Sequence, residues 1–143
     1  MTSFIGTKLG RYAIIGLQRG DLILESIEKV LKESGIRNAI VTSGIAATSH
    51  MHWHHIGVTD EKPDDWMFET DGPMEVGGIG GLVLDGIPHL HCSFADHQRA
   101  WVGHLEKGCE VAYVGEITLI ELLDADVKRI ANAYGVNEIH RMA

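Results

Sequence analysis

The chain has few cysteines, few positive charges and no long apolar run. Its 143 residues include only Cys92 and Cys109, too few for the disulfide framework of a small secreted domain. No apolar run approaches the roughly 20 residues of a membrane-spanning helix, and residues 1–8 lack the apolar centre of a signal peptide. We therefore expect a cytoplasmic protein with two free thiols and no membrane partner.

The shortage of positive charge bears on nucleic acid as a partner. Lys and Arg number 12 against 20 Asp and Glu, giving a net charge of −8 with neutral histidines. Non-specific nucleic-acid binding depends on clustered Lys and Arg that displace counterions from the phosphate backbone. Here the cations are scattered, and Lys128-Arg129 is their only adjacent pair. The charge therefore argues against nucleic-acid binding.

What remains is an ordinary globular composition. Hydrophobic residues make up 45% and charged residues 22%, which excludes wholesale disorder and fibrous repeats. The length fits one domain and leaves no room for a second core. No linker, low-complexity tract or internal repeat interrupts the sequence. We expect a single domain over residues 1–143.

The first third of the chain predicts a strand, a helix and a second strand. Residues 11–17 form a short apolar run, and residues 37–43 form another that ends before Gly44. Between them, Gly20-Asp21 suits a helix start and Gly35 suits a left-handed helix end. The intervening apolar residues follow helical spacing: Ile23, Leu24, Ile27, Val30 and Leu31.

The rest of the chain predicts mainly strands, with a helix at the end. The expected extended segments are residues 49–56, 66–69, 74–84, 88–95, 100–105 and 110–123. Residues 124–134, closed by Gly135, show helical spacing of apolar residues. The predicted fold is α/β of the α+β kind. It has one mixed, mostly antiparallel sheet, one main packing helix and a C-terminal helix.

The histidines are the most informative feature of the sequence. Two residues apart on a strand, His89 and His91 share a face at about 7 Å. A hairpin with its loop centred between His97 and Gln98 places His91 opposite His104, with Cβ atoms roughly 5 Å apart. Three converging imidazoles leave a tetrahedral divalent ion one open position, as in catalytic zinc sites. Cys92 alternates to the other face and is predicted to lie in the core.

Alternatives to a metal site stay open at this point. A lone His-x-His is common on half-exposed strands, and a register shift of one residue would turn His104 to the other face. His50, His52 and His54 form a second alternating set, whose outer members are about 13 Å apart and cannot share an ion from one strand. That set either faces solvent or an interface, or lines the same cleft as the predicted metal site.

Glu75 is the carboxylate that we single out as a catalytic candidate. It lies on the glycine-interrupted segment 74–84, where an acid near a metal-bound water could act as a base or orient a ligand. The alternative is an exposed strand glutamate without a special role.

Several motifs together resemble one known family. They are Gly20-Asp21, Thr42-Ser43-Gly44-Ile45, Gly72-Pro73-Met74-Glu75-Val76, Asp85-Gly86-Ile87-Pro88-His89-Leu90-His91 and Gly103-His104-Leu105-Glu106-Lys107-Gly108-Cys109. From about residue 11 to residue 123 the chain resembles the plant-and-prokaryote-conserved (PPC) domain, in its stand-alone prokaryotic form. The resemblance implies a mostly antiparallel α/β fold, a homotrimer and, as in some prokaryotic members, zinc at His89, His91 and His104. Residues 124–143 would be a helical extension outside the shared domain.

The departures from the family pattern affect the predicted function. The Arg-Gly-Arg-Pro hook with which plant relatives enter the DNA minor groove is absent, and the segment around Glu75 lacks the plant arginine. The fold also resembles those of acetolactate decarboxylase and a small zinc-dependent ester hydrolase, which is an analogy of fold alone.

Two classes of function follow. We expect a protein that binds zinc or another divalent metal and acts on a small carbonyl or carboxylate compound, as a hydrolase-like or decarboxylase-like enzyme or as a sensor. The alternative is a DNA-binding or transcription-associated module, a label that prokaryotic relatives receive by similarity to the plant proteins.

Overall fold

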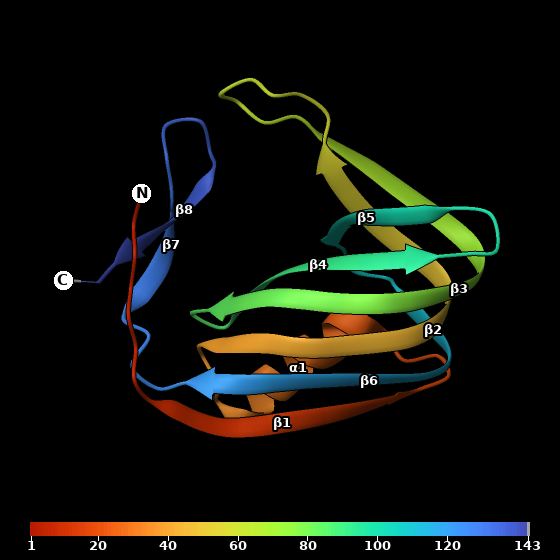
Figure 1. The fold of residues 1–143 in the computed structure, drawn as a ribbon, viewed down its shortest axis with the longest axis horizontal. Coiled ribbons are helices and arrows are strands. Elements are labelled where there is room, and N and C mark those ends of the chain that lie inside the picture. Colours follow the sequence, from red (N-terminus) through yellow and green to blue (C-terminus); the bar gives the residue numbers. More distant parts are fainter. Residues whose placement is uncertain (143) are drawn as a thin grey trace.

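The described part of the chain forms one six-stranded sheet, one helix and a small C-terminal hairpin (Figure 1). The computed structural model describes residues 1–142. The strands of the main sheet lie in the order β1-β6-β2-β3-β4-β5. Their bounds are β1 Leu9–Gln18, β2 Ala39–Ile56, β3 Asp65–Leu84, β4 Ile87–Ala95, β5 Ala100–Leu105 and β6 Glu110–Leu122. Within residues 1–142, no helix is long and apolar enough to cross a membrane.

Helix α1 (Ile23–Ser34) covers one face of the sheet, behind β1, β6 and β2 in Figure 1. Its buried residues Ile23, Ile27 and Leu31 recur every four positions and form one apolar stripe. Gly35 ends the helix in the left-handed conformation, at φ 71°. At the start, no side chain caps the helix, because the Asp21 carboxylate accepts the amide of Gln18 instead.

The sheet is antiparallel throughout, and its two longest strands each unite segments that the sequence suggested as separate. Strand β2 pairs with β6 and β3 along its first part, and its last residues pair with β5. There Trp53 is opposite Leu105, and His54 is opposite His104. Because β5 also pairs with β4, the strands β2, β3, β4 and β5 close into a ring.

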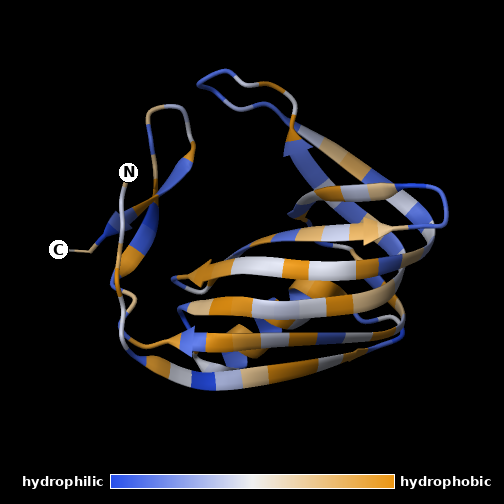
Figure 2. Cartoon of the chain, in the orientation of Figure 1, coloured by the Kyte–Doolittle hydropathy of each residue, from blue (hydrophilic) through white to orange (hydrophobic). Residues whose placement is uncertain are grey.

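Residues alternate between a buried apolar inner face and an exposed outer face, and the colours along many strands alternate accordingly (Figure 2). On β2, Met51 and Trp53 are buried, whereas the intervening histidines point outward. The Trp53 ring lies within 4.9–5.9 Å, between centroids, of the rings of Phe68, Phe94 and Trp101. This aromatic group fills the core inside the ring of strands.

The hairpin predicted around His97 and Gln98 is confirmed. In the observed register, His91 is opposite His104 and Ala95 is opposite Ala100. Cys92 faces the core, as expected, with 2% of its surface exposed. Both cysteines are free and buried.

The predicted C-terminal helix is wrong. Residues Val127–Ala131 and Asn137–Arg141 form strands β7 and β8, a separate antiparallel hairpin. Its turn is stabilised by Asn132, whose side-chain oxygen accepts the amides of Tyr134 and Val136. Ile130 and Tyr134, which helical spacing would bury, are 41% and 48% exposed. Local turn chemistry therefore outweighs the apolar periodicity of this segment.

The contact between β5 and β2 requires a glycine at position 103. A Cβ atom there would lie 2.6 Å from the carbonyl oxygen of His54 and 2.7 Å from Cδ1 of Trp53. We predict that Gly103→Ala destabilises the fold by about 1–3 kcal/mol, because neither neighbour can move freely. At Gly16, on exposed β1, a Cβ would meet nothing within 4 Å. Urea denaturation of Gly103→Ala and Gly16→Ala tests this, and equal stabilities would contradict the close approach.

Candidate metal centre

Four histidines from three adjacent strands meet on the outer face of the sheet. His91 on β4 is opposite His104 on β5, and His104 is opposite His54 on β2. His89 lies two residues before His91 on the same face of β4. The cluster therefore depends on β5 lying between β4 and β2.

The three histidines that the sequence singled out are brought together. The ring centroids of His89 and His91 are 5.4 Å apart, those of His89 and His104 5.0 Å, and those of His91 and His104 5.5 Å. Three imidazoles bound to one tetrahedral zinc at Zn–N distances of about 2 Å have centroids roughly 5 Å apart. The ring centroids of these three histidines therefore have about the spacing of imidazoles around one tetrahedral ion.

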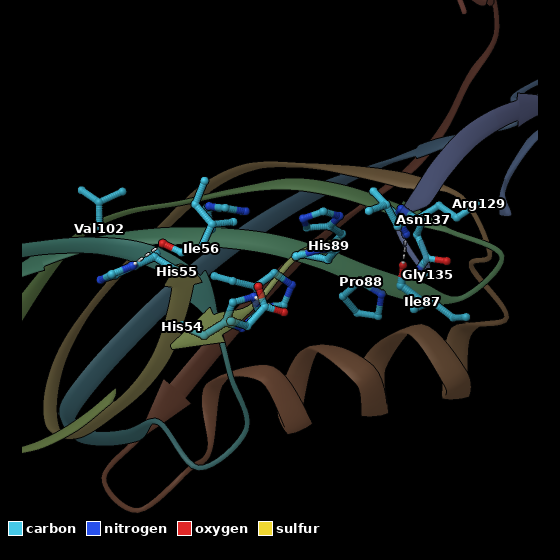
Figure 3. A pocket seen from close by; sticks show the side chains of 16 residues that line it. His54, His55, Ile56, Ile87, Pro88, His89, Val102, Arg129, Gly135 and Asn137 are labelled. Atoms are coloured by element: carbon cyan, nitrogen blue, oxygen red, sulfur yellow. Dashed lines mark hydrogen bonds and ion pairs between the residues drawn. The ribbon is translucent and has the colours of Figure 1, made fainter. Parts of the chain in front are cut away.

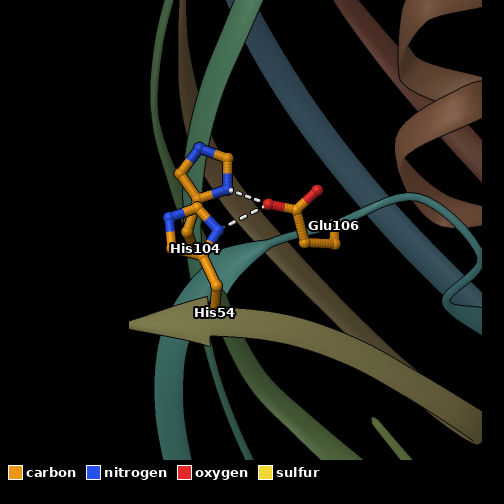
Figure 4. A group of neighbouring side chains, drawn as sticks. All are labelled: His54, His104 and Glu106. Carbon is orange, nitrogen blue, oxygen red and sulfur yellow. Dashed lines mark hydrogen bonds and ion pairs between the residues drawn. The ribbon is translucent and has the colours of Figure 1, made fainter. Parts of the chain in front are cut away.

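A second trio in the cluster includes a carboxylate that the sequence reasoning missed. Ligand atoms of His54, His104 and Glu106 all lie within 4.8 Å of one another. Glu106 Oε1 is 2.5 Å from His54 Nδ1 and 3.3 Å from His104 Nδ1 (Figure 4). Two ligands of a tetrahedral zinc are about 3.3 Å apart, so the 2.5 Å contact is a hydrogen bond and not a shared coordination edge.

Glu106 could have been found from strand alternation. It lies two residues after His104, and residues two apart on an extended chain share a face. In this position its carboxylate faces the Nδ1 atoms of His54 and His104 and not their Nε2 atoms. An outer carboxylate that orients a metal-binding imidazole in this way is common in zinc sites.

Burial lowers the pKa of two histidines of the cluster, His89 and His104. Burial lowers the pKa of His89, and the neighbouring His104 and Arg129 lower it further. The pKa of His104 is lowered by burial and by His54, against an opposing effect of Glu106. His104 Nδ1 is buried and makes no hydrogen bond, and the Glu106 carboxylate lies 3.3 Å from it. Neutral imidazoles are the form that binds a metal ion.

The histidines lie on one side of a cavity of about 640 Å³ (Figure 3). The end of β2, the loop after it and the start of β3 add Ile56, Pro63 and Asp65. The C-terminal hairpin adds Arg129 and Asn137. This volume is typical of sites for small molecules.

Of the second histidine set, only His54 lines this cavity. His50 Nδ1 is 2.7 Å from Asp71 Oδ1, and His52 Nδ1 is 2.9 Å from the carbonyl oxygen of Lys107. His54 therefore lines the cleft, which is one of the two interpretations that the sequence left open. His50 and His52 make separate contacts outside it.

Glu75 is not brought to the histidines. It pairs with Ala95 at the far end of β4, four residues and about 13 Å of strand from His91. There it lines a separate cavity of about 420 Å³ together with His97 and Tyr113. The antiparallel register of β3 and β4 causes this separation.

Comparison with solved structures shows the fold in other organisms. A plant- and prokaryote-conserved (PPC) protein from Pyrococcus horikoshii is 27% identical, with a TM-score of 0.82 over 100% of this chain and 99% of that one. Two others are 22% identical and cover 94% of this chain and 95% of theirs. They are a metal-containing protein from Archaeoglobus fulgidus, with a TM-score of 0.81, and a candidate DNA-binding protein from Bacteroides thetaiotaomicron, with a TM-score of 0.76.

Sequence comparison finds a curated protein that matches over part of its length and a family model that matches most of this chain. The chain is 28% identical over 124 residues to the bifunctional protein GlmU of Synechococcus sp. (strain JA-3-3Ab), which covers 85% of this chain and 19% of GlmU. The chain thus spans about a fifth of the length of that curated relative. The model of the Plants and Prokaryotes Conserved (PCC) domain matches residues 5–123. Because this match covers most of the chain, the protein belongs to the PCC domain family, as its motifs predicted.

Proposed function

We propose that His89, His91 and His104 hold zinc or another divalent metal ion. The observation that carries this proposal is the meeting of three imidazoles from two strands, with ring centroids no more than 5.5 Å apart. A second support is Glu106, whose carboxylate faces Nδ1 of His104 and so favours binding through Nε2.

We further propose that the protein acts on a small carbonyl or carboxylate compound, in a hydrolase-like or decarboxylase-like reaction. A divalent ion at the three histidines would polarise a substrate oxygen or lower the pKa of water. The chain itself offers a proton-transfer group in His54, whose Nδ1 hydrogen bonds to Glu106 and whose Nε2 is 3.9 Å from Asp65. His54 thus lies where the sequence analysis had expected Glu75 to act.

The homotrimer implied by the family resemblance is also part of the proposal, as is a cytoplasmic location. Opposite α1, the outer face of β1, β6 and β2 exposes several large apolar side chains. Tyr12 and Ile14 on β1 are 73% and 72% exposed, and Ile45 on β2 and Val114 on β6 are 48% and 63% exposed. An apolar sheet face of this kind supports association between copies. The two free thiols support a reducing compartment.

Histidine variants test the ligand set. We predict that each of the variants His89→Ala, His91→Ala and His104→Ala binds zinc more than about 100-fold more weakly. This exceeds the usual effect of losing a residue that only hydrogen bonds to a metal ligand. His54→Ala should retain zinc, because His54 is bound to Glu106 instead. Titration against a chromophoric chelator measures the affinities, with exposed His97→Ala as control. Loss of zinc in His54→Ala with retention in His89→Ala would instead favour the trio of His54, His104 and Glu106.

The orienting role of Glu106 gives a separate prediction. Glu106→Gln keeps the size of the side chain but removes the charge that favours a proton on Nδ1 of His104 and His54. We expect zinc affinity to fall about 10- to 100-fold while the fold is retained. The control is Glu28→Gln, since Glu28 pairs with Lys107 away from the cluster. Unchanged affinity in Glu106→Gln would show that this carboxylate does not support the site.

DNA binding remains the second candidate, because a structural neighbour is described as a candidate DNA-binding protein. The net charge of −8 opposes it. We predict no duplex binding tighter than about 10⁻⁴ M at physiological salt, weaker than typical non-specific binding. A salt titration by fluorescence anisotropy measures this. Micromolar affinity that falls steeply with added salt would overturn the ranking.

A further inference from the structure

The C-terminal hairpin forms one wall of the histidine cavity. Arg129 and Asn137 of the hairpin line the cavity next to His89 (Figure 3), and Val136 lines it as well. The hairpin begins at Val127, after the end of the family match at residue 123. This wall is therefore a part of the site that membership of the family does not describe.

The hairpin is held firmly against the main sheet. The Arg129 guanidinium donates to the carbonyl oxygens of Ile87 and Leu82, both at 2.9 Å. Val127 is buried, with 9% of its surface exposed. Because Leu82 is the register partner of His89, the guanidinium is fixed beside the proposed metal ligands.

Arg129 carries a charge that nothing in the described chain compensates. Within residues 1–142, no carboxylate lies within 4 Å of its guanidinium, and no other Lys or Arg lines the cavity. Burial lowers the pKa of Arg129, with no acidic neighbour to oppose the shift. A half-buried cation without a counterion is unfavourable. Two of its five N–H groups are the donors to Ile87 and Leu82, which leaves others for a ligand.

We infer that the cavity binds a small carboxylic acid whose carboxylate pairs with Arg129 while its other end lies at the histidines. This inference rests on the proposed metal function. A planar guanidinium matches a carboxylate in both charge and shape, and a single cation suits a single negative charge. Asp65, near His54, disfavours the reverse orientation. The apolar side chains of Ile87, Pro88 and Val136 suit a short aliphatic chain between the two ends.

The length of the ligand follows from the strand geometry. Arg129 is bound to the carbonyls of Leu82, opposite His89, and of Ile87, two residues before His89, so its guanidinium lies at most about 7 Å from His89 along β4. A metal-binding group and a carboxylate joined by two or three methylene groups cover about this distance. Larger acids would have to extend out of the cavity.

Two matched probes separate the carboxylate from the metal-binding end. Acetohydroxamate carries only the zinc-binding group, whereas succinate monohydroxamate carries the same group and a carboxylate. Calorimetric titration of the zinc-loaded protein gives the dissociation constant of each. We expect succinate monohydroxamate to bind about 10- to 100-fold more tightly, the range for a hydrogen-bonded charged pair.

Arginine variants assign that gain to one side chain. In Arg129→Gln, the advantage of the carboxylated probe over acetohydroxamate should fall to about twofold or less. Both probes are compared at full zinc loading, so that a change in zinc affinity does not affect the ratio. The matched control is Arg141→Gln, because Arg141 also lies on the hairpin and donates to a backbone carbonyl, that of Ser3, but does not line the cavity. Arg141→Gln should keep the full advantage.

Each outcome is decisive. If the parent protein binds neither zinc nor another divalent metal ion, the proposed function is wrong and this inference falls with it. If zinc binds but neither hydroxamate binds the zinc-loaded protein, the metal site stands and this inference is wrong. If acetohydroxamate binds but the carboxylate brings no gain, the proposed function stands and the inference is wrong. The inference is also wrong if Arg129→Gln keeps the gain or if Arg141→Gln loses it.

Discussion

The return of β5 to the end of β2 is the constraint on which the rest of the structure depends. Two residue pairs, Trp53 with Leu105 and His54 with His104, close the ring of strands. The close approach is allowed because residue 103 has no side chain. On the inner face, this closure encloses the aromatic group around Trp53. On the outer face, it places His104 between His91 and His54.

The core and the site thus lie on the same strands. Neighbouring residues of a strand point to opposite faces, one into the core and the next into the site. Trp53, buried against Phe94 and Trp101, is the immediate neighbour of His54. Packing of the inner rings therefore fixes the backbone from which the histidines project, because side chains in a dense core have few alternative arrangements. The site gains its rigidity from large apolar groups that no ligand contacts, which is how binding groups are commonly positioned.

Local rules in the sequence accounted for much of this arrangement. Strand alternation and the symmetric loop were enough to predict the register of His91 and His104, because both depend on a few adjacent residues. The position of His54 depended on pairing with a strand about 50 residues away, which no local pattern contains. Glu75 was placed too near the histidines because the register of β3 against β4 was unknown. The C-terminal segment was misread because its apolar spacing suited a helix while Asn132 favoured a turn.

The burial of both thiols has a consequence for the chemistry of the chain. Burial raises the pKa of Cys92 to about 12. It is also the main reason why the pKa of Cys109 is raised to about 11. Sγ of Cys109 is further held between the backbone of His52 and the carbonyl of Glu106. Peroxides and alkylating agents react with thiolates, which neither residue forms at neutral pH. Oxidative stress should therefore leave both sulfur atoms intact.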